Sequence, residues 1–332
     1  MTPKERLNAR LAGEPVDKIP NMNIFMAIIA REAGVSYRDY VLDYRNLVKG
    51  NLICAEKYGV DSVGVISESR ETAAYGAKVI YPENASPYSD PPMIGDDFDL
   101  SKIVLFGPLE HPRTLDRVKA CELLHEKAGG DYPVIGWIEG CLAQAAELRG
   151  INNLMMDLAE EEAYLDDLLP ILHEPQKRFA QAQIAAGAGI IGVGNAVSSL
   201  IGPALYERYG LPWDKSITEY IHSLGAKVKL HICGNITALL PLLKQIEADI
   251  LDIDWMVDFA AAVKFYDGSK TAINGNMDPV AVMMQGSVEE VEKQVNYCIN
   301  AGTNTTLISG GCEIPAATPD ENLLRMDKLL YR

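Results

Sequence analysis

The stretch Lys227-Val228-Lys229-Leu230-His231-Ile232-Cys233 has the length and composition of a β-strand, and the residues from Gly234 onward run into a helical pattern. Short apolar runs bounded by turn residues are typical of strands buried in a parallel sheet. Comparable runs recur along the chain. We expect further strands near Asn21–Phe25, Asp61–Ile66, Pro133–Glu139, Ile190–Gly194, Asp249–Asp254, Thr271–Asn276 and Asn304–Ser309.

Between these runs lie longer stretches with apolar residues at helical spacing. The predicted helices include Tyr37–Tyr58, Pro203–Leu224, Ile236–Ile246, Val288–Asn300 and Pro319–Leu330. About eight strands alternating with helices over most of the 332 residues predict an α/β fold of the (β/α)8 TIM-barrel type. A doubly wound sheet is the alternative.

No low-complexity linker divides the sequence, so residues 1–332 are expected to form a single domain with a helical N-terminal extension. The segment Tyr81–Pro112 holds six of the 18 prolines and shows little periodicity. Such a stretch is either a long surface connection or a lid over a site.

The balance of charges excludes several classes of partner. The chain carries 30 basic and 46 acidic residues, a formal net charge of −16, which argues against nucleic acid or an anionic membrane as the main partner. The first residues lack the apolar core of a secretory signal, and six cysteines in so long a chain are no disulfide scaffold. We therefore expect a cytoplasmic protein with reduced thiols.

Three residues at predicted strand ends form a candidate metal site. His231 and Cys233 are two positions apart in one strand, so their side chains point the same way, and Cys312 follows the last predicted strand. In a barrel, the carboxyl ends of the strands carry the chemistry. One histidine and two cysteines are a set that binds zinc with a fourth position open, as in catalytic sites. The alternative is that both cysteines are small buried core residues.

Further polar residues follow other predicted strands. Each of them on its own is compatible with a cap or turn, but together they favour a ligand-binding mouth. Those we expect to orient substrate or support the site are Glu139, Asn195, Ser198, Tyr206, Asp254 and Asn276. Tyr206 falls within a predicted helix, where it could simply pack. Glu313 is a candidate fourth metal ligand because it adjoins Cys312.

Several motifs resemble the uroporphyrinogen decarboxylase superfamily, whose fold is a (β/α)8 barrel. The resemblance begins at Thr2-Pro3-Lys4-Glu5-Arg6 and Pro15–Pro20 and continues through the middle of the chain. Its other motifs are Ala55–Asp61 (AEKYGVD), Asp252–Trp255 (DIDW), Gly275–Pro279 (GNMDP) and Gly311–Pro315 (GCEIP).

Two branches of this superfamily differ at positions that can be read here. Decarboxylases carry an arginine-rich loop of the RQAGRY type, whereas the nearest segment, Ala30–Ser36, lacks the second arginine. They also carry GHG where this chain has Gly311-Cys312-Glu313. A substrate with many carboxylates needs cationic groups to hold it. The cysteines instead resemble the methylcobamide:coenzyme M methyltransferase branch, which binds zinc through an HxC…C pattern.

This resemblance implies that His231, Cys233 and Cys312 bind Zn²⁺ and that the chain moves a methyl group between a corrinoid and a small molecule. The corrinoid, methylcobalamin on a carrier protein, would be a co-substrate, and a thiol such as coenzyme M is the expected small molecule. One alternative is an O-demethylase that passes a methyl group from a methoxyarene or another methylated substrate to Co(I). A second is a decarboxylase-like enzyme. A homodimer is compatible with the sequence, which does not decide the oligomeric state.

Overall fold

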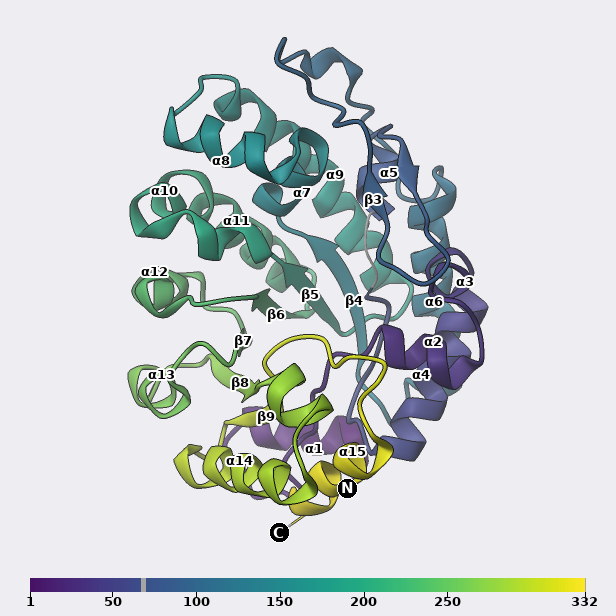
Figure 1. The fold of residues 1–332 in the computed structure, drawn as a ribbon, viewed down its shortest axis with the longest axis vertical. Coiled ribbons are helices and arrows are strands. Elements are labelled where there is room, and N and C mark those ends of the chain that lie inside the picture. The colour runs from purple at the N-terminus through teal and green to yellow at the C-terminus, as the bar shows by residue number, and fades with distance from the viewer. Residues whose placement is uncertain (67–69, 332) are drawn as a thin grey trace.

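The computed structural model describes residues 1–66 and 70–331. Within these residues seven parallel strands form one sheet in the order β1-β4-β5-β6-β7-β8-β9. Figure 1 shows the sheet curled on itself, and this confirms the predicted TIM-barrel class. The strands are β1 Val63–Gly64, β4 Val134–Glu139, β5 Ile190–Gly194, β6 Lys227–Ile232, β7 Ile250–Ile253, β8 Ala272–Met277 and β9 Leu307–Gly310.

The first predicted strand, Asn21–Phe25, occupies the gap between β9 and β1 without forming a regular ladder. Asn21 makes a single parallel bridge to Ile308 in β9. On the other side the Asn21 carbonyl accepts a hydrogen bond from the Asp61 amide at 2.8 Å, just before β1. The segment therefore takes the eighth position of the barrel through isolated contacts. The alternation of apolar residues in the sequence could not distinguish such an extended segment with isolated contacts from a regular β-strand.

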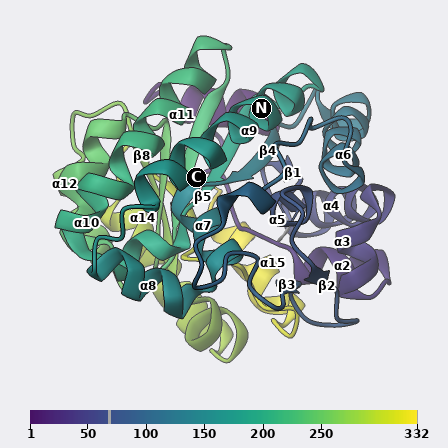
Figure 2. The same ribbon diagram turned by 90° about the horizontal axis from the view of Figure 1, so that it is seen from above.

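Helices cover the outside of the sheet, and the view from above shows them on both sides of the strands (Figure 2). They follow the strands in the alternating order that parallel strands require. The α-helices are α1 Pro3–Leu11, α2 Ala27–Ala33, α3 Tyr37–Leu42, α4 Tyr44–Tyr58, α5 Arg70–Ala74, α6 Pro112–Ala128, α7 Cys141–Arg149, α8 Ile151–Ala159, α9 Leu165–Ala185, α10 Gly202–Tyr209, α11 Leu211–Ser223, α12 Leu240–Leu243, α13 Phe259–Phe265, α14 Val288–Ala301 and α15 Asp320–Leu329.

Single-turn helices fill several of the connections. They are the 3₁₀ segments η1 Leu100–Lys102, η2 Ala196–Leu200, η3 Thr237–Leu239 and η4 Lys244–Ile246, and the π-helical segment η5 Pro279–Met284. Because η3, α12 and η4 together replace one regular helix, the prediction of a continuous helix at Ile236–Ile246 was wrong.

Two long predicted helices are each split into two. The stretch Tyr37–Tyr58 breaks at Asp43, whose extended backbone ends α3 and whose side chain caps α4 by accepting from the Arg45 amide. The stretch Pro203–Leu224 breaks at Gly210, between α10 and α11. Apolar spacing continues across both breaks because the two helices of each pair pack on the same core.

The proline-rich connection Tyr81–Pro112 packs on the ends of two helices. It contains β3 Tyr88–Ser89, paired antiparallel with β2 Val79–Ile80. The Ile94 amide bonds to the Leu148 carbonyl at the end of α7, and the Val104 amide bonds to the Tyr75 carbonyl just after α5. In Figure 1 this connection runs past α5 toward the top of the view. It contributes no residue to the cavity described below.

Most of the interior is apolar and continuous. Buried hydrophobic side chains from nearly every strand and helix form one cluster. In the described ranges, no helix combines the length and apolar character needed to cross a membrane.

Candidate metal and substrate site

His231, Cys233 and Cys312 come together at the carboxyl ends of β6 and β9. His231 Nε2 lies 3.0 Å from Cys233 Sγ and 3.7 Å from Cys312 Sγ, and the two sulfur atoms are 3.2 Å apart. Among the described residues, these three side chains form a group whose ligand atoms all lie within 4.8 Å of one another. The strand arrangement thus brings together two residues that are 79 positions apart in sequence.

The chemistry and spacing of these donors fit zinc. Zn–N bonds of about 2.0–2.1 Å and Zn–S bonds of about 2.3 Å give tetrahedral edges of about 3.5–3.8 Å. The observed edge of 3.7 Å already lies in this range, and the edges of 3.0 and 3.2 Å need to lengthen by about half an ångström to reach it. Imidazole and thiolate ligands are also the set that zinc prefers.

Asp252 contacts the ring nitrogen of His231 that faces away from the two cysteines. Its Oδ2 lies 3.0 Å from His231 Nδ1 and also pairs with Lys229, while its Oδ1 accepts from Asn274 Nδ2 at 2.8 Å. The strand register explains the arrangement, because His231 pairs with Asp252 and Asp252 pairs with Asn274 across β6, β7 and β8. A partner on one ring nitrogen fixes which nitrogen faces a metal.

The charges of this buried cluster shift the pKa values of its members. Burial would lower the pKa of His231, but Asp252 and Cys312 beside it raise that pKa to about 9. Burial opposes ionisation of Asp252, yet Lys229 and His231 lower its pKa to about 2. These shifts favour a charged pair between His231 and Asp252, whose Nδ1 and Oδ2 atoms lie 3.0 Å apart.

The two thiols divide unequally between protonated and ionised forms. A hydrogen bond from Cys233 lowers the pKa of Cys312; burial opposes this shift and His231 supports it. The same hydrogen bond and burial raise the pKa of Cys233. These opposite shifts favour Cys312 as the thiolate of the pair, and the thiolate is the form that binds metals.

Asp254 and Asn276 hold the backbone around the cysteines. Asp254 Oδ2 accepts from the Gly234 amide at 2.7 Å and Oδ1 from the Trp255 amide at 2.6 Å. Asn276 Nδ2 donates to the carbonyls of Asp254 at 3.1 Å and Val257 at 2.7 Å. Neither residue lines the cavity, so both act on the loops that follow Cys233 and β7.

A cavity of about 170 Å³ opens beside the three ligand-type side chains. Its other lining residues are apolar except for two carboxylates and one amide. The full lining is Ile24, Met26, Ile66, Trp137, Glu139, Gly194, Asn195, Ala196, His231, Cys233, Cys312 and Glu313. Glu139 Oε1 accepts from Trp137 Nε1 at 2.9 Å, and Glu313 Oε1 accepts from the Ala27 amide at the start of α2 at 2.8 Å.

Asn195 lines this cavity, whereas Tyr206 and Ser198 lie behind it. Asn195 Nδ2 donates to both oxygens of Asp214, at 2.7 and 2.8 Å, and Tyr206 OH donates to Asp214 Oδ2 at 2.6 Å. Ser198 is fully buried on the same turn as Asn195. Tyr206 thus supports Asn195 through Asp214 and has no direct access to the cavity.

Sequence reasoning assigned no role to Lys229 or Asp214, and it placed Asp252 only among the polar residues that end predicted strands. Lys229 was detectable, because it shares the two-residue spacing and hence the face of His231 and Cys233. Asp252 ends a predicted strand, but which strand lies next to β6 follows only from the fold. Asp214 sits in a helical pattern and leaves no sequence signal.

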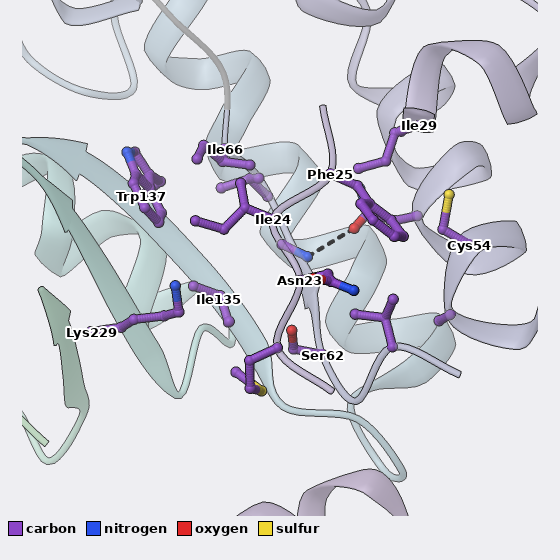
Figure 3. Close-up of a pocket in the computed structure, with 16 residues that line it drawn as sticks. Asn23, Ile24, Phe25, Ile29, Cys54, Ser62, Ile66, Ile135, Trp137 and Lys229 are labelled. Atoms are coloured by element: carbon purple, nitrogen blue, oxygen red, sulfur yellow. Dashed lines mark hydrogen bonds between the residues drawn. The ribbon is translucent and has the colours of Figure 1, made fainter. Parts of the chain in front are cut away.

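A second, smaller cavity lies in the barrel interior next to the first. Its volume is about 50 Å³, and Ile24, Ile66 and Trp137 line both cavities. Figure 3 shows Trp137 and Lys229 reaching toward this space from the sheet, with Ile24 and Phe25 entering from the N-terminal segment. These three apolar side chains therefore lie at the boundary between the two cavities.

Comparison with known proteins identifies the family. A family model described as uroporphyrinogen decarboxylase (URO-D) matches residues 2–331. The chain belongs to this family. The resemblance inferred from its motifs is therefore confirmed.

Within the uroporphyrinogen decarboxylase family, methyltransferases are among the relatives that match nearly the whole chain. Methylcobamide:CoM methyltransferase MtbA of Methanosarcina mazei is 29% identical over 337 residues, covering 98% of this chain and 96% of that protein. A uroporphyrinogen decarboxylase of Carboxydothermus hydrogenoformans is 28% identical over 232 residues, covering 68% of this chain and 65% of that protein. The predicted methyltransferase branch is thus confirmed.

A solved structure shares the fold. A methyltransferase from Methanosarcina mazei superposes with a TM-score of 0.88 at 22% identity, covering 98% of this chain and 97% of the other.

Arg31 shows how the chain departs from the decarboxylases. It lies in the segment that would correspond to their arginine-rich loop, yet it is absent from the cavity lining. Its guanidinium donates to the carbonyls of Ala316 at 2.7 Å and Thr318 at 3.0 Å. In this protein the arginine ties down the loop that follows Cys312.

Proposed function

We propose that the protein is a zinc-dependent methyltransferase that moves a methyl group between a corrinoid on a carrier protein and a small thiol such as coenzyme M. The observation that supports this is the convergence of His231, Cys233 and Cys312 beside a cavity. A protein matched over its whole length has the name methylcobamide:CoM methyltransferase, which fits such a reaction.

The residues around the cavity have separable roles in this proposal. His231, Cys233 and Cys312 would hold the zinc ion, with Asp252 keeping the proton on His231 Nδ1 so that Nε2 faces the metal. A bound zinc ion supplies a positive charge that lowers the pKa of a thiol coordinated to it. Apolar walls formed by Ile24, Ile66 and Trp137 exclude water from the reacting sulfur.

The group transfer balances as a simple displacement. The substrate thiolate attacks the methyl carbon of the corrinoid, the new carbon–sulfur bond forms and the cobalt–carbon bond breaks. The electron pair of the broken bond remains on cobalt, which becomes Co(I). No other oxidant or reductant is required.

The test combines metal analysis with a methyl-transfer assay. Purified protein should contain about one zinc ion per chain and should demethylate methylcobalamin when coenzyme M is added. The Cys312→Ser variant should lose at least about 100-fold in rate, since the metal supplies several kcal/mol to such a step. Cys298→Ala, which changes a buried cysteine on α14 outside the site, is the matched control.

Other outcomes select the alternatives. Zinc-free protein with full activity would overturn the proposal. A zinc enzyme that ignores thiols but demethylates methoxyarenes in the presence of Co(I) would select the O-demethylase. Replacing free methylcobalamin by a methylated corrinoid protein should raise the rate if a carrier protein is the natural partner.

A further inference from the structure

Four exposed apolar side chains lie on loops at the same end of the barrel as the candidate zinc ligands. Leu200 lies in η2 after β5, Trp255 and Met256 follow β7, and Val280 lies in η5 after β8. Each of the four is between 44% and 60% exposed. A single exposed leucine is ordinary, whereas several large apolar side chains on neighbouring loops mark an interaction site. We call these four residues the apolar rim.

The apolar rim borders Cys312 through the loop after β7. A Cβ on Gly311, the residue before Cys312, would lie 2.5 Å from the Trp255 backbone nitrogen. The loops that carry Trp255 and Cys312 are therefore closely packed. Because Cys312 is only partly buried and also lines the cavity, this part of the rim lies next to the cavity.

The apolar rim borders Cys233 through the loop after β5. A Cβ on Gly234, the residue after Cys233, would lie 2.9 Å from Ser199 Oγ, and Leu200 is the next residue. Cys233 is also partly buried and lines the cavity. The two thiols are thus flanked by two loops of the rim. In Figure 1, α10 and α13, to which these loops lead, lie on the left of the view.

The loops at this end of β5 to β9 hold no basic residue. None of the stretches 195–202, 233–239, 254–258, 278–287 and 311–319 contains a lysine or an arginine. Their acidic residues are Asp254, Asp258, Asp278 and Glu313. Such a surface suits a partner that is apolar or donates hydrogen bonds, and it disfavours an anionic one.

The cavity is too small to enclose a corrinoid. Its volume is about 170 Å³. Pockets that enclose drug-sized ligands measure about 300–1,000 Å³, and a corrinoid is larger than such ligands. Methyl transfer nevertheless requires the methyl carbon and the attacking sulfur to approach within about 3–3.5 Å of each other. The corrin ring must therefore lie on the surface beside Cys233 and Cys312, with its methyl group directed into the cavity.

We propose that the apolar rim is the surface on which the corrin ring of the carrier protein docks. This inference rests on the proposed function and names the contact surface for its corrinoid partner. The edge of a corrin ring carries methyl groups, which match Leu200, Trp255 and Met256. It also carries primary amides, whose N–H groups are neutral donors and match the partly exposed carboxylates of Asp258 and Asp278. A ring of this kind needs no cation on the protein surface.

A charge placed on the apolar rim tests the proposal, with free methylcobalamin as the probe. Leu200→Asp puts a carboxylate on the rim, and Leu324→Asp puts the same group on an exposed leucine of α15 as the matched control. Both variants and wild type are loaded with zinc, and their zinc content is measured. Equilibrium dialysis without thiol gives the affinity for methylcobalamin, and initial rates with coenzyme M give KM for each substrate.

Leu200→Asp should bind methylcobalamin at least about 10-fold more weakly than wild type, because docking would bury a carboxylate in place of an apolar contact. Met256→Asp should show the same loss from the other loop. Zinc content and KM for coenzyme M should match wild type in both variants. Leu324→Asp should match wild type in every measurement.

Equal affinity of Leu200→Asp and Leu324→Asp for methylcobalamin would overturn the inference. A wild-type dimer that Leu200→Asp separates into monomers would also overturn it, because a second copy of the chain would then cover the rim. If methylcobalamin binds with the expected dependence on Leu200 but no thiol accepts its methyl group, the proposed function fails and the docking surface stands.

Discussion

At the scale of single residues, Asp252 governs the candidate ligand His231. We expect Asp252→Asn to weaken zinc binding about 10–100-fold, because the neutral amide no longer orients the ring or supports its charge. The measurement is zinc affinity by competition with a chelator. Asp249→Asn, which alters a similar pairing with His222 away from the site, should leave the affinity within about two-fold.

Asp252→Asn also leaves the buried ammonium group of Lys229 without its charged partner, since Lys229 pairs with Asp252 and is only 2% exposed. Loss of one partner of a buried pair destabilises proteins by about 3–5 kcal/mol. The double variant Lys229→Met with Asp252→Asn removes the unpaired ammonium group and should recover much of the lost unfolding free energy. Recovery of zinc affinity along with stability would contradict the orienting role of Asp252.

Asp214 makes stability depend on pH. Burial raises the pKa of this carboxyl from 3.8 to about 6 in the folded protein. The unfolded chain therefore releases the proton first, and the fold loses stability as pH rises from about 4 to about 6. Two pKa units correspond to about 3 kcal/mol.

Asp214→Asn has no proton to release and should remove this dependence. Chemical denaturation of wild type and variant, both with chelator, gives the difference in unfolding free energy at each pH. The variant should gain about 3 kcal/mol relative to wild type between pH 4 and pH 7. A difference that stays constant over this range would show that Asp214 does not titrate as described.

At the scale of elements, most strands could be predicted from sequence because burial on both faces leaves continuous apolar runs. Cys54, Cys121, Cys141 and Cys298, the four cysteines outside the candidate metal site, are all buried. Helix breaks at Asp43 and Gly210 were missed, since apolar spacing continues through them.

The candidate ligands were predictable because they follow strands, whereas their supports were not. Asp252 acts on His231 across two strands, and Asp214 reaches Asn195 from a helix. Contacts of this kind depend on which strands and helices become neighbours in the fold, and the local sequence does not indicate those neighbours. Tyr206, which we expected to orient substrate, donates its OH to Asp214 and does not line the cavity.

The backbone at Gly311, just after β9, packs closely against the residues that follow β7, and this contact sets the position of Cys312. A Cβ on Gly311 would lie 2.5 Å from the Trp255 backbone nitrogen and 2.8 Å from Asp254 Oδ1. The Trp255 backbone cannot move aside as a flexible side chain could. Gly311→Ala should therefore displace Cys312 and lower zinc affinity and the methyl-transfer rate by at least about 10-fold. Gly130→Ala meets no atom within 4 Å and should match wild type in both assays. Unchanged zinc binding by Gly311→Ala would contradict this tight crossing.

At the scale of the whole molecule, one buried carboxylate joins both ends of the chain to the barrel. Asp61 pairs with Arg6 of α1 and with Lys18 at 3.0 Å, and Lys18 also pairs with Asp327 of α15 at 2.6 Å. The Asn21 amide donates to Asp61 Oδ2 at 2.7 Å, which fixes the segment in the eighth barrel position. The two termini lie near each other beside α1 and α15 (Figure 1).

Closure of the barrel should therefore depend on the charge of Asp61. Asp61→Asn keeps the volume but leaves Arg6 and Lys18 buried with less compensation, so we expect a loss of about 3–5 kcal/mol in unfolding free energy. Asp17 also pairs with Arg6, but its side chain is 40% exposed, and Asp17→Asn should cost no more than about 1 kcal/mol. Urea denaturation of both variants measures the difference. Equal losses of unfolding free energy in the two variants would contradict the prediction, because the buried Asp61 would then contribute no more than the exposed Asp17. A larger loss for Asp61→Asn, with faster amide exchange in β1 and β9, would locate the effect at the closing segment between them.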